Sequence, residues 1–219
     1  MLFRSTASGL VQAAAGWTES KDHLLPKGKD FAIDLPELGT SWFDDGPVKC
    51  HIFLPEFYKE HQWYPMLVWF PDAKGDDKLI LPKRLTERRN FIIVSMPYQP
   101  EAGGRGGSKT DWTFHRAVLN AVEKKVKNVI PQKKLAFGYG IGADQITHHL
   151  SKNGKEFMAY FTGIAIGGGG KPSGGLNQLS GIRALAFTGD KEESKPELER
   201  FKTEATAAGA EVAWIEFFD

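Results

Sequence analysis

Continuous apolar runs recur along the chain and are separated by segments with helical periodicity. Such runs predict strands buried on both faces of a sheet, and they occupy residues 66–70, 91–96, 160–166 and 183–188. Apolar residues at helical spacing predict helices at 79–89, 111–126 and 195–208, with Asp111 as a suitable N-cap for the second. Strands that alternate with helices predict a mostly parallel sheet with helices on both faces.

The two ends of this pattern differ from its middle. Residues 31–35 and 47–54 predict two strands that open the sheet in antiparallel fashion, and Pro55 ends the second. A last strand is predicted at 211–217. Residues 1–30 are mixed and polar and predict an irregular arm, so residues 31–219 are expected to form one α/β domain.

Composition argues against several classes of function. The chain carries 28 Lys and Arg against 27 Asp and Glu, so no global charge attracts nucleic acid or an anionic membrane. No apolar stretch reaches the roughly 18 residues of a membrane span, and the N-terminus lacks the apolar stretch of a signal peptide. The single cysteine, Cys50, cannot form an internal disulfide. A cytoplasmic protein is therefore expected.

The segment 133–150 carries the strongest local signal in the sequence. A short apolar run leads into three alternate glycines, Gly138, Gly140 and Gly142, and apolar residues then recur at helical spacing. This pattern predicts a strand, a sharp turn and a helix. The G-x-S-x-G motif of a nucleophile elbow has the same frame, with glycines where the two backbones come close. The nucleophilic serine is replaced here by Gly140, which cannot attack a carbonyl carbon.

The order of these elements resembles the α/β-hydrolase superfamily, most closely the esterase group of polyhydroxybutyrate-depolymerase-like and feruloyl-esterase-like proteins. The likeness covers residues 47–219. It rests on the elbow and on four further segments, which are the strand 67–70, the helix opening at 111–114, the strand 161–165 and the segment 188–192, where the family carries its catalytic acid. The resemblance implies an α/β-hydrolase fold.

The catalytic parts that this resemblance implies are incomplete. Gly140 stands where the family has serine, and Pro71 and Asp72 stand where it usually has His-Gly, which supplies a backbone N–H to the oxyanion hole. Proline has no N–H, and an anionic Asp72 opposes a developing oxyanion. Asp190 and Glu192 are candidates for the acid, and Glu192 lies nearer the usual offset. The elbow residues, including Ile141, and the oxyanion loop are therefore expected to be vestigial.

The histidine of the family follows the last strand, whereas the given sequence ends at Asp219 without one and without the final helix that usually covers the sheet. Truncation could account for the missing base, but Gly140 and Pro71 lie deep inside the sequence. A base must reach the nucleophile, so none of the histidines is expected to be catalytic. They are His23, His51, His61, His115, His148 and His149.

Two other glycine motifs compete with the elbow. Gly138, Gly140 and Ala143 satisfy the dinucleotide fingerprint G-x-G-x-x-A, but the strand that follows ends without the acidic residue that should hold the ribose. The glycine-rich segment 167–175 lacks the spacing of a phosphate-binding loop and is expected to lie at the carboxyl edge of the sheet. Metal ligands do not cluster along the sequence. Neither a cofactor nor a metal is expected.

These losses predict a pseudoenzyme, an inactive α/β-hydrolase-fold protein that acts by binding or as a structural subunit of an assembly. Its partner would be another protein or a second copy of the chain. The alternative is an esterase-like hydrolase of small or polymeric esters, in which Asp144 or Glu192 activates water at an unconventional site. A third hypothesis is a small ligand in the vestigial cleft above Gly140, at the carboxyl ends of the parallel strands.

Overall fold

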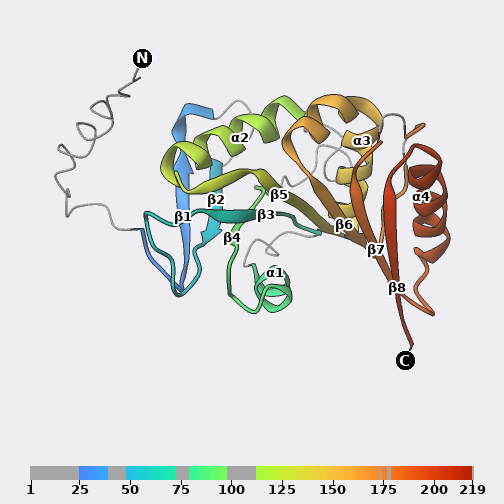
Figure 1. The fold of residues 1–219 in the computed structure, drawn as a ribbon, viewed down its shortest axis with the longest axis horizontal. Coiled ribbons are helices and arrows are strands. Elements are labelled where there is room, and N and C mark those ends of the chain that lie inside the picture. The colour runs from blue at the N-terminus through green and yellow to red at the C-terminus, as the bar shows by residue number, and fades with distance from the viewer. Residues whose placement is uncertain are drawn as a thin grey trace, which may run out of the picture.

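An eight-stranded mixed sheet runs through the part of the chain that the structure describes (Figure 1). The structure is a computed structural model, and it describes residues 25–38, 48–72, 79–97, 112–172, 174–176 and 179–218. The strand order is β1-β2-β4-β3-β5-β6-β7-β8. The strands are β1 (Asp30–Leu35), β2 (Val48–Phe53), β3 (Tyr64–Phe70), β4 (Ile92–Ser95), β5 (Val129–Tyr139), β6 (Gly163–Gly167), β7 (Arg183–Gly189) and β8 (Glu211–Phe217).

The directions of the strands confirm the predicted opening of the sheet. β1 pairs with β2, and β2 with β4, in antiparallel fashion, whereas the pairs from β4 through β3, β5, β6 and β7 to β8 are all parallel. The helices are α1 (Ile80–Leu85), α2 (Trp112–Lys125), α3 (Ile141–Tyr160) and α4 (Lys195–Ala207), with a 3-10 turn η1 (Pro36–Leu38) after β1. None of the described helices is long and apolar enough to cross a membrane.

The two faces of the sheet are covered unequally. Helices α2, α3 and α4 lie on one face and bury the larger core, to which residues such as Val118, Ile146 and Leu198 belong (Figure 1). The smaller core lies on the other face, where Leu79 at the start of the short α1 packs with Trp69 and Phe137. Among the described elements, three helices therefore cover one face of the sheet, the thick layer, and the short α1 covers part of the other, the thin layer.

Three predicted boundaries were wrong, each for a local reason. The first helix ends at Leu85 instead of residue 89, because Glu87, Arg88 and Asn90 take positive φ angles that end helical hydrogen bonding. The strand predicted from residue 160 begins at Gly163, since α3 continues to Tyr160. The buried side chain of Tyr160 donates a hydrogen bond to Glu123.

The strand before the elbow is longer than predicted and includes Pro131. β3 and β5 pair at Tyr64 with Val129 and next at Met66 with Lys134, so the register shifts where the proline lies. Proline cannot donate to the ladder and is tolerated at such an irregularity. The predicted arm is mostly outside the described residues, because residues 1–24 are not described, and Asp111 is not described either.

The larger core predicts a strong effect at Phe70, the last residue of β3. Its fully buried ring packs against those of His115, Phe157 and Phe161. Phe70→Ala should lower the free energy of unfolding by about 3–5 kcal/mol, because a large cavity is left in a packed core. Denaturant titration measures it. Phe57→Ala is the matched control, since Phe57 is 76% exposed and should change stability by less than about 0.5 kcal/mol.

Candidate functional site

The turn between β5 and α3 has the predicted form of strand, sharp turn and helix. β5 ends at Tyr139, Gly140 takes φ 55° and ψ −123°, and α3 begins at Ile141. The Gly140 N–H donates a 2.9 Å hydrogen bond to the carbonyl of Gly167 at the end of β6, which fixes the turn at the carboxyl edge of the sheet. A backbone with this positive φ strains any residue with a side chain, and glycine adopts it freely.

The carboxylate of Asp72 fills the space above Gly140. Asp72 Oδ1 accepts a 2.7 Å hydrogen bond from the Ile141 N–H. A Cβ atom built on Gly140 would lie 2.0 Å from this oxygen and 2.5 Å from Asp72 Cγ, far inside van der Waals contact. The side chain of a nucleophile at position 140 and the observed carboxylate of Asp72 therefore exclude each other.

The register of the sheet brings Asp72 to this position. β3 and β5 are parallel neighbours, and Phe70 pairs with Gly138. Asp72 and Gly140 each follow these paired residues by two positions. The parallel strands therefore place them next to each other at the carboxyl edge of the sheet. The N–H that follows the nucleophile is one donor of an oxyanion hole, and here that donor is the N–H that binds Asp72. Sequence spacing alone did not indicate this contact.

The other glycines of the motif allow helix and strand to approach. A Cβ on Gly142 would lie 2.0 Å from the carbonyl oxygen of Phe70, and one on Gly138 would lie 2.5 Å from the backbone of Gly142. Close backbone contact between β3, β5 and α3 therefore requires these two glycines, whether or not position 140 carries a nucleophile.

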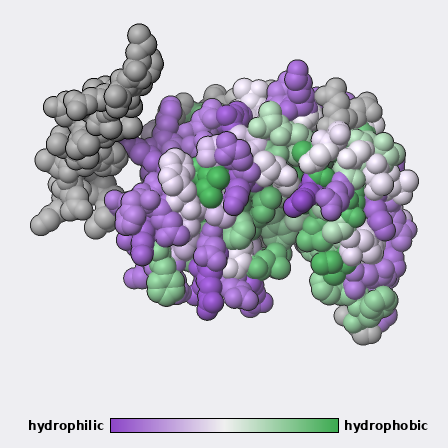
Figure 2. Space-filling view, in the orientation of Figure 1, coloured by the Kyte–Doolittle hydropathy of each residue, from purple (hydrophilic) through white to green (hydrophobic). Residues whose placement is uncertain are grey.

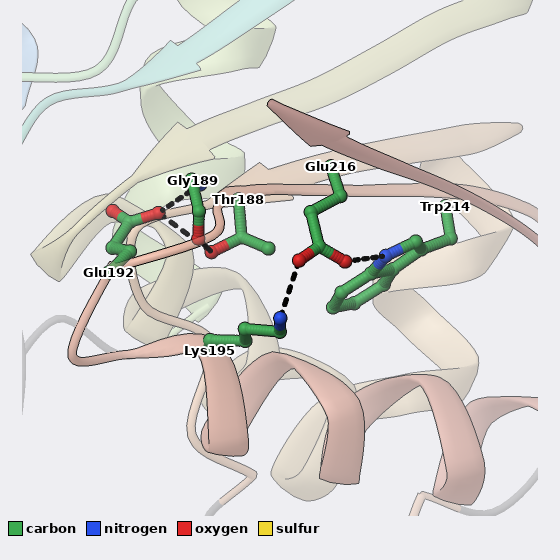
Figure 3. A network of polar contacts seen from close by, with 6 residues as sticks. All are labelled: Thr188, Gly189, Glu192, Lys195, Trp214 and Glu216. Carbon is green, nitrogen blue, oxygen red and sulfur yellow. Dashed lines mark hydrogen bonds and ion pairs between the residues drawn. The ribbon is translucent and has the colours of Figure 1, made fainter. Parts of the chain in front are cut away.

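Glu192, one of the two predicted acid positions, is held beside the elbow by three hydrogen bonds. Tyr139 Oη donates to Oε1 at 2.7 Å, while Thr188 Oγ1 and the Gly189 N–H donate to Oε2 at 2.8 and 3.1 Å. Figure 3 shows the carboxylate of Glu192 turned toward Thr188 and Gly189. Glu192 therefore belongs to a fixed polar network at the end of β7.

The hydrogen-bond network and burial shift the pKa values of both Glu192 and Tyr139. Partial burial raises the pKa of Glu192, but the hydrogen bonds from Tyr139, Thr188 and Gly189 outweigh it and leave that pKa below its usual value. The hydrogen bond to Glu192, followed by burial and by the charges of Glu192 and Asp72, raises the pKa of Tyr139 to about 12. At neutral pH Glu192 is therefore a carboxylate, and Tyr139 is a neutral phenol.

The second acid candidate lies in a different environment. The Asp190 N–H donates to the carbonyl of Phe217, and Asp190 Oδ1 is buried without a hydrogen-bond partner among the described residues. Nearby, Lys195 Nζ binds Glu216 Oε1 at 2.5 Å, and Trp214 Nε1 lies 3.5 Å from Glu216 Oε2 (Figure 3). These contacts fasten α4 to β8, and none of them involves the elbow.

Asp144, the other residue considered as a base for water, ties α3 to the glycine-rich loop after β6. Its Oδ1 accepts hydrogen bonds from the N–H groups of Gly170 and Lys171, at 2.8 and 3.0 Å. Two backbone donors of this loop are therefore bound to a carboxylate. Among the described residues, no three side chains of the metal-ligating kinds come together.

Two histidines meet in the core. His115 Nδ1 lies 2.8 Å from His149 Nε2, both side chains are buried, and the rings of Phe70 and Trp112 pack against the pair. His149 follows Gly140 by nine residues, which is roughly 13 Å along a helix. The sequence places these histidines 34 residues apart, so only the packing of α2 on α3 reveals the pair.

Solved structures of esterases share this arrangement of elements. EstE1, a thermostable carboxylesterase cloned from a metagenomic library, aligns with 88% of this chain and 80% of its own at a TM-score of 0.66 and 14% identity. The hyperthermophilic esterase of Pyrobaculum calidifontis aligns with 88% and 77% at a TM-score of 0.67 and 13% identity. A ferulic acid esterase aligns with 88% and 90% at a TM-score of 0.63 and 14% identity.

The chain has the α/β-hydrolase fold. The eight-stranded, mostly parallel sheet with its antiparallel opening agrees with these neighbours, as the sequence motifs predicted. At identities of 13–14% the likeness extends to the fold alone. The sequence matches no protein-family model and no curated protein. The dinucleotide alternative is not favoured, because the glycine motif follows β5, the fifth described strand along the chain, whereas the fingerprint follows the first strand of a dinucleotide-binding unit.

The clash at the elbow predicts that Gly140 and Asp72 are energetically coupled. Gly140→Ala should cost about 1–3 kcal/mol, because the backbone keeps a positive φ and the Asp72 carboxylate must move away from the new methyl group and give up its hydrogen bond. Asp72→Ala removes the carboxylate, so the double variant should be more stable than the sum of the single effects by about 1–3 kcal/mol. Chemical denaturation of the four proteins measures the coupling.

Asp34→Ala provides the matched control for this cycle. Asp34 is an exposed aspartate of β1, four strands from β5, or roughly 19 Å at the usual strand spacing. Its effect should add to that of Gly140→Ala within about 0.5 kcal/mol. Additivity of the Asp72 pair as well would contradict the contact at the elbow.

The buried histidine pair predicts a loss of stability in mild acid. Burial, and next the interaction with His149, hold the pKa of His115 well below its usual range. Below about pH 6.5 the unfolded chain takes up a proton on this histidine that the folded chain excludes. The contribution of His115 to the free energy of unfolding is therefore fully present above that pH. It falls by about 1.4 kcal/mol per pH unit below it, until the folded pKa is reached.

Unfolding titrations at about pH 7.5, 6.5 and 5.5 measure this slope. His115→Gln should flatten it, since glutamine does not titrate. His61→Gln is the control at an exposed histidine. An equal slope in both variants would show that His115 is not its source.

Proposed function

We propose that this chain is an α/β-hydrolase-fold protein without hydrolase activity, which acts by binding or as a structural subunit of an assembly. The observation that carries the proposal is the carboxylate of Asp72 at the elbow, 2.7 Å from the Ile141 N–H and 2.0 Å from the point where a side chain on Gly140 would begin. Position 140 offers no group that could form an acyl-enzyme.

Asp72 opposes ester hydrolysis in two further ways. It accepts the hydrogen bond of the Ile141 N–H, so this donor is not available to a developing oxyanion. Its negative charge lies where the transition state of acyl transfer would develop negative charge, and the two charges repel each other. Pro71, which precedes it, has no N–H to serve as a second donor.

The buried histidine pair does not supply a general base at the elbow. His149 is roughly 13 Å along α3 from Gly140 and is buried against His115. A base must lie within about 3 Å of the proton that it removes, or one water molecule away. This separation supports a structural role for the pair.

The alternative function is an unconventional esterase-like hydrolase, and the fold shared with esterases favours it. Glu192 lies beside the elbow through its hydrogen bond to Tyr139 and is the group that could activate water there. Its lowered pKa makes it a weaker base than an ordinary glutamate. Asp144 already accepts two backbone hydrogen bonds through Oδ1. These contacts weigh against the alternative.

Hydrolysis of p-nitrophenyl acetate and p-nitrophenyl butyrate by the purified chain tests the proposal. We expect a rate that rises linearly with ester concentration, shows no saturation and does not differ from that of Glu192→Gln and Asp144→Asn. Both substitutions keep the shape of the side chain and remove its charge. The linear background is the reaction of esters with surface nucleophiles that any protein has.

Saturable turnover by the unaltered chain would overturn the proposal. Its loss in Glu192→Gln, with retention in Asp144→Asn, would assign the alternative to the network of Tyr139 and Glu192. The opposite pattern would assign it to the loop held by Asp144. Circular dichroism of each variant separates a lost activity from a lost fold.

A further inference from the structure

The strand directions define an edge of the sheet that lies opposite the elbow. β1, β4, β3 and β5 run in one direction and β2 in the other, so the starts of four strands and the end of β2 lie together. We call this edge the amino edge, and it comprises residues 26–29, 54–63, 86–91 and 124–128. The elbow follows the other end of β5, whose 11 residues separate the two by roughly 30 Å.

The first three segments of the amino edge all carry exposed positive charge. Lys27 and Lys29 precede β1, Lys59 lies in the loop between β2 and β3, and Arg88 and Arg89 precede β4. β2 is a neighbour of both β1 and β4, and β4 is a neighbour of β3. The strand order therefore brings these cations together from distant parts of the sequence.

The turn from α2 into β5 extends the positive charge with Lys124, Lys125 and Lys127, all exposed. None of these eight cations forms an ion pair with another described residue, whereas Lys83 nearby is paired with Asp30. The exposed acidic residues of the edge are Glu56, Glu60 and Glu87. The amino edge is therefore strongly basic, although the whole chain carries a net charge of only +1.

The same edge exposes two large aromatic side chains on a fixed loop. Phe57 is 76% exposed and Trp63 is 60% exposed. Tyr64 Oη accepts a hydrogen bond from the Lys59 N–H at 2.9 Å and donates one to the Phe57 carbonyl at 3.3 Å. The side-chain amide of Asn128 donates to backbone carbonyls of this loop, among them that of Lys59. The loop is therefore held against the lysine-rich turn before β5, while both rings remain in water.

The cations form a broad front with these aromatic rings among them. They follow the edge from β1 to β5 over four strand spacings, or roughly 19 Å. This edge lies on the left of the molecule, where β3 and β5 begin (Figure 1). Figure 2 shows mostly hydrophilic surface on this side, with a hydrophobic patch at its lower tip.

The combination of positive charge and exposed rings narrows the class of partner. Clusters of about four to eight Lys and Arg residues bind the headgroups of anionic lipids. Trp is typical of the boundary between headgroups and acyl chains, and a Phe ring, which has no polar atom, is favoured there as well. Single-stranded nucleic acid also stacks on aromatic rings, but it lies in a positively charged groove that follows its backbone. A broad front of charge fits a planar surface better.

We propose that the amino edge binds the surface of an anionic lipid bilayer. The lysines and arginines would contact the charged groups of the headgroups, and the rings of Phe57 and Trp63 would enter the layer between headgroups and acyl chains. The elbow, at the opposite end of β5, would face away from the bilayer. This inference goes beyond the proposed function and uses none of the residues of the elbow, so either can fail without the other.

Co-sedimentation of the purified chain with lipid vesicles tests the binding. We expect the chain to sediment with vesicles of phosphatidylcholine that contain about 30% phosphatidylserine, and to remain in solution with phosphatidylcholine alone. Raising the NaCl concentration from about 0.1 to about 0.5 M should weaken binding about tenfold or more, because salt screens exposed charges.

A triple variant tests the role of the edge. Lys124→Gln, Lys125→Gln and Lys127→Gln together should weaken binding to the phosphatidylserine vesicles about a hundredfold, since each cation near an anionic surface contributes a separate attraction. Circular dichroism shows whether the variant keeps its fold.

The matched control removes the same amount of charge elsewhere. Lys152, Lys171 and Lys191 are exposed and lie outside the amino edge. Their joint replacement by Gln lowers the net charge equally but should weaken binding less than about fivefold, because these charges lie beyond the screening length from the bilayer.

The aromatic rings are tested separately. Phe57→Ala and Trp63→Ala should each weaken binding about fivefold or more, whereas Phe218→Ala, at a residue that is 78% exposed after β8, should leave it unchanged. Vesicles with brominated acyl chains should quench the fluorescence of the bound chain. Trp63→Phe should still bind and should lose most of this quenching.

Three results would overturn the proposal. They are a chain that binds neither kind of vesicle, a chain that binds both kinds equally, and a triple variant that binds as well as its matched control. A single-stranded oligonucleotide of about 20 nucleotides is the competing ligand. If the chain binds it more tightly than the vesicles, and the triple variant loses that binding, the amino edge is a nucleic-acid site instead.

Discussion

The contact between Asp72 and the turn at Gly140 constrains this molecule more than any other interaction of the site. It couples the end of β3 to the first turn of α3, through a 2.7 Å hydrogen bond to the Ile141 N–H. A carboxylate at the N-terminus of a helix is favoured by the helix dipole and satisfies a backbone donor that helices leave unpaired. Asp72 thus caps α3 from a neighbouring strand and occupies the space of an elbow side chain.

The frame of the turn does not depend on a side chain at position 140. The close packing of Gly142 on the Phe70 carbonyl and the hydrogen bond from Gly140 to Gly167 preserve the strand-turn-helix geometry without a nucleophile. Around it, Asp72 accepts the hydrogen bond of the Ile141 N–H, and Glu192 accepts that of Tyr139. A fold shared with solved esterases is therefore present here with a glycine at the turn between β5 and α3.

The unequal cover of the sheet is a second constraint on the molecule. The face under α2, α3 and α4 buries the large core with the histidine pair. The other face is closed over Trp69 and Phe137 but leaves Ile215 and Phe217 in contact with water. The thin layer therefore leaves apolar side chains of β8 exposed.

The sequence alone determined the strands, the order of helices and the glycine frame of the elbow, because these depend on local spacing along the chain. It also determined the absence of a nucleophile at Gly140. It missed the end of α1 and the start of β6, since positive φ angles at residues such as Glu87 and the continuation of α3 to Tyr160 have no distinct signal. Pairs such as Asp72 with Gly140, Tyr139 with Glu192 and His115 with His149 were decided by the tertiary structure. Their members are 34 or more residues apart, and only strand register and helix packing bring such distant side chains together.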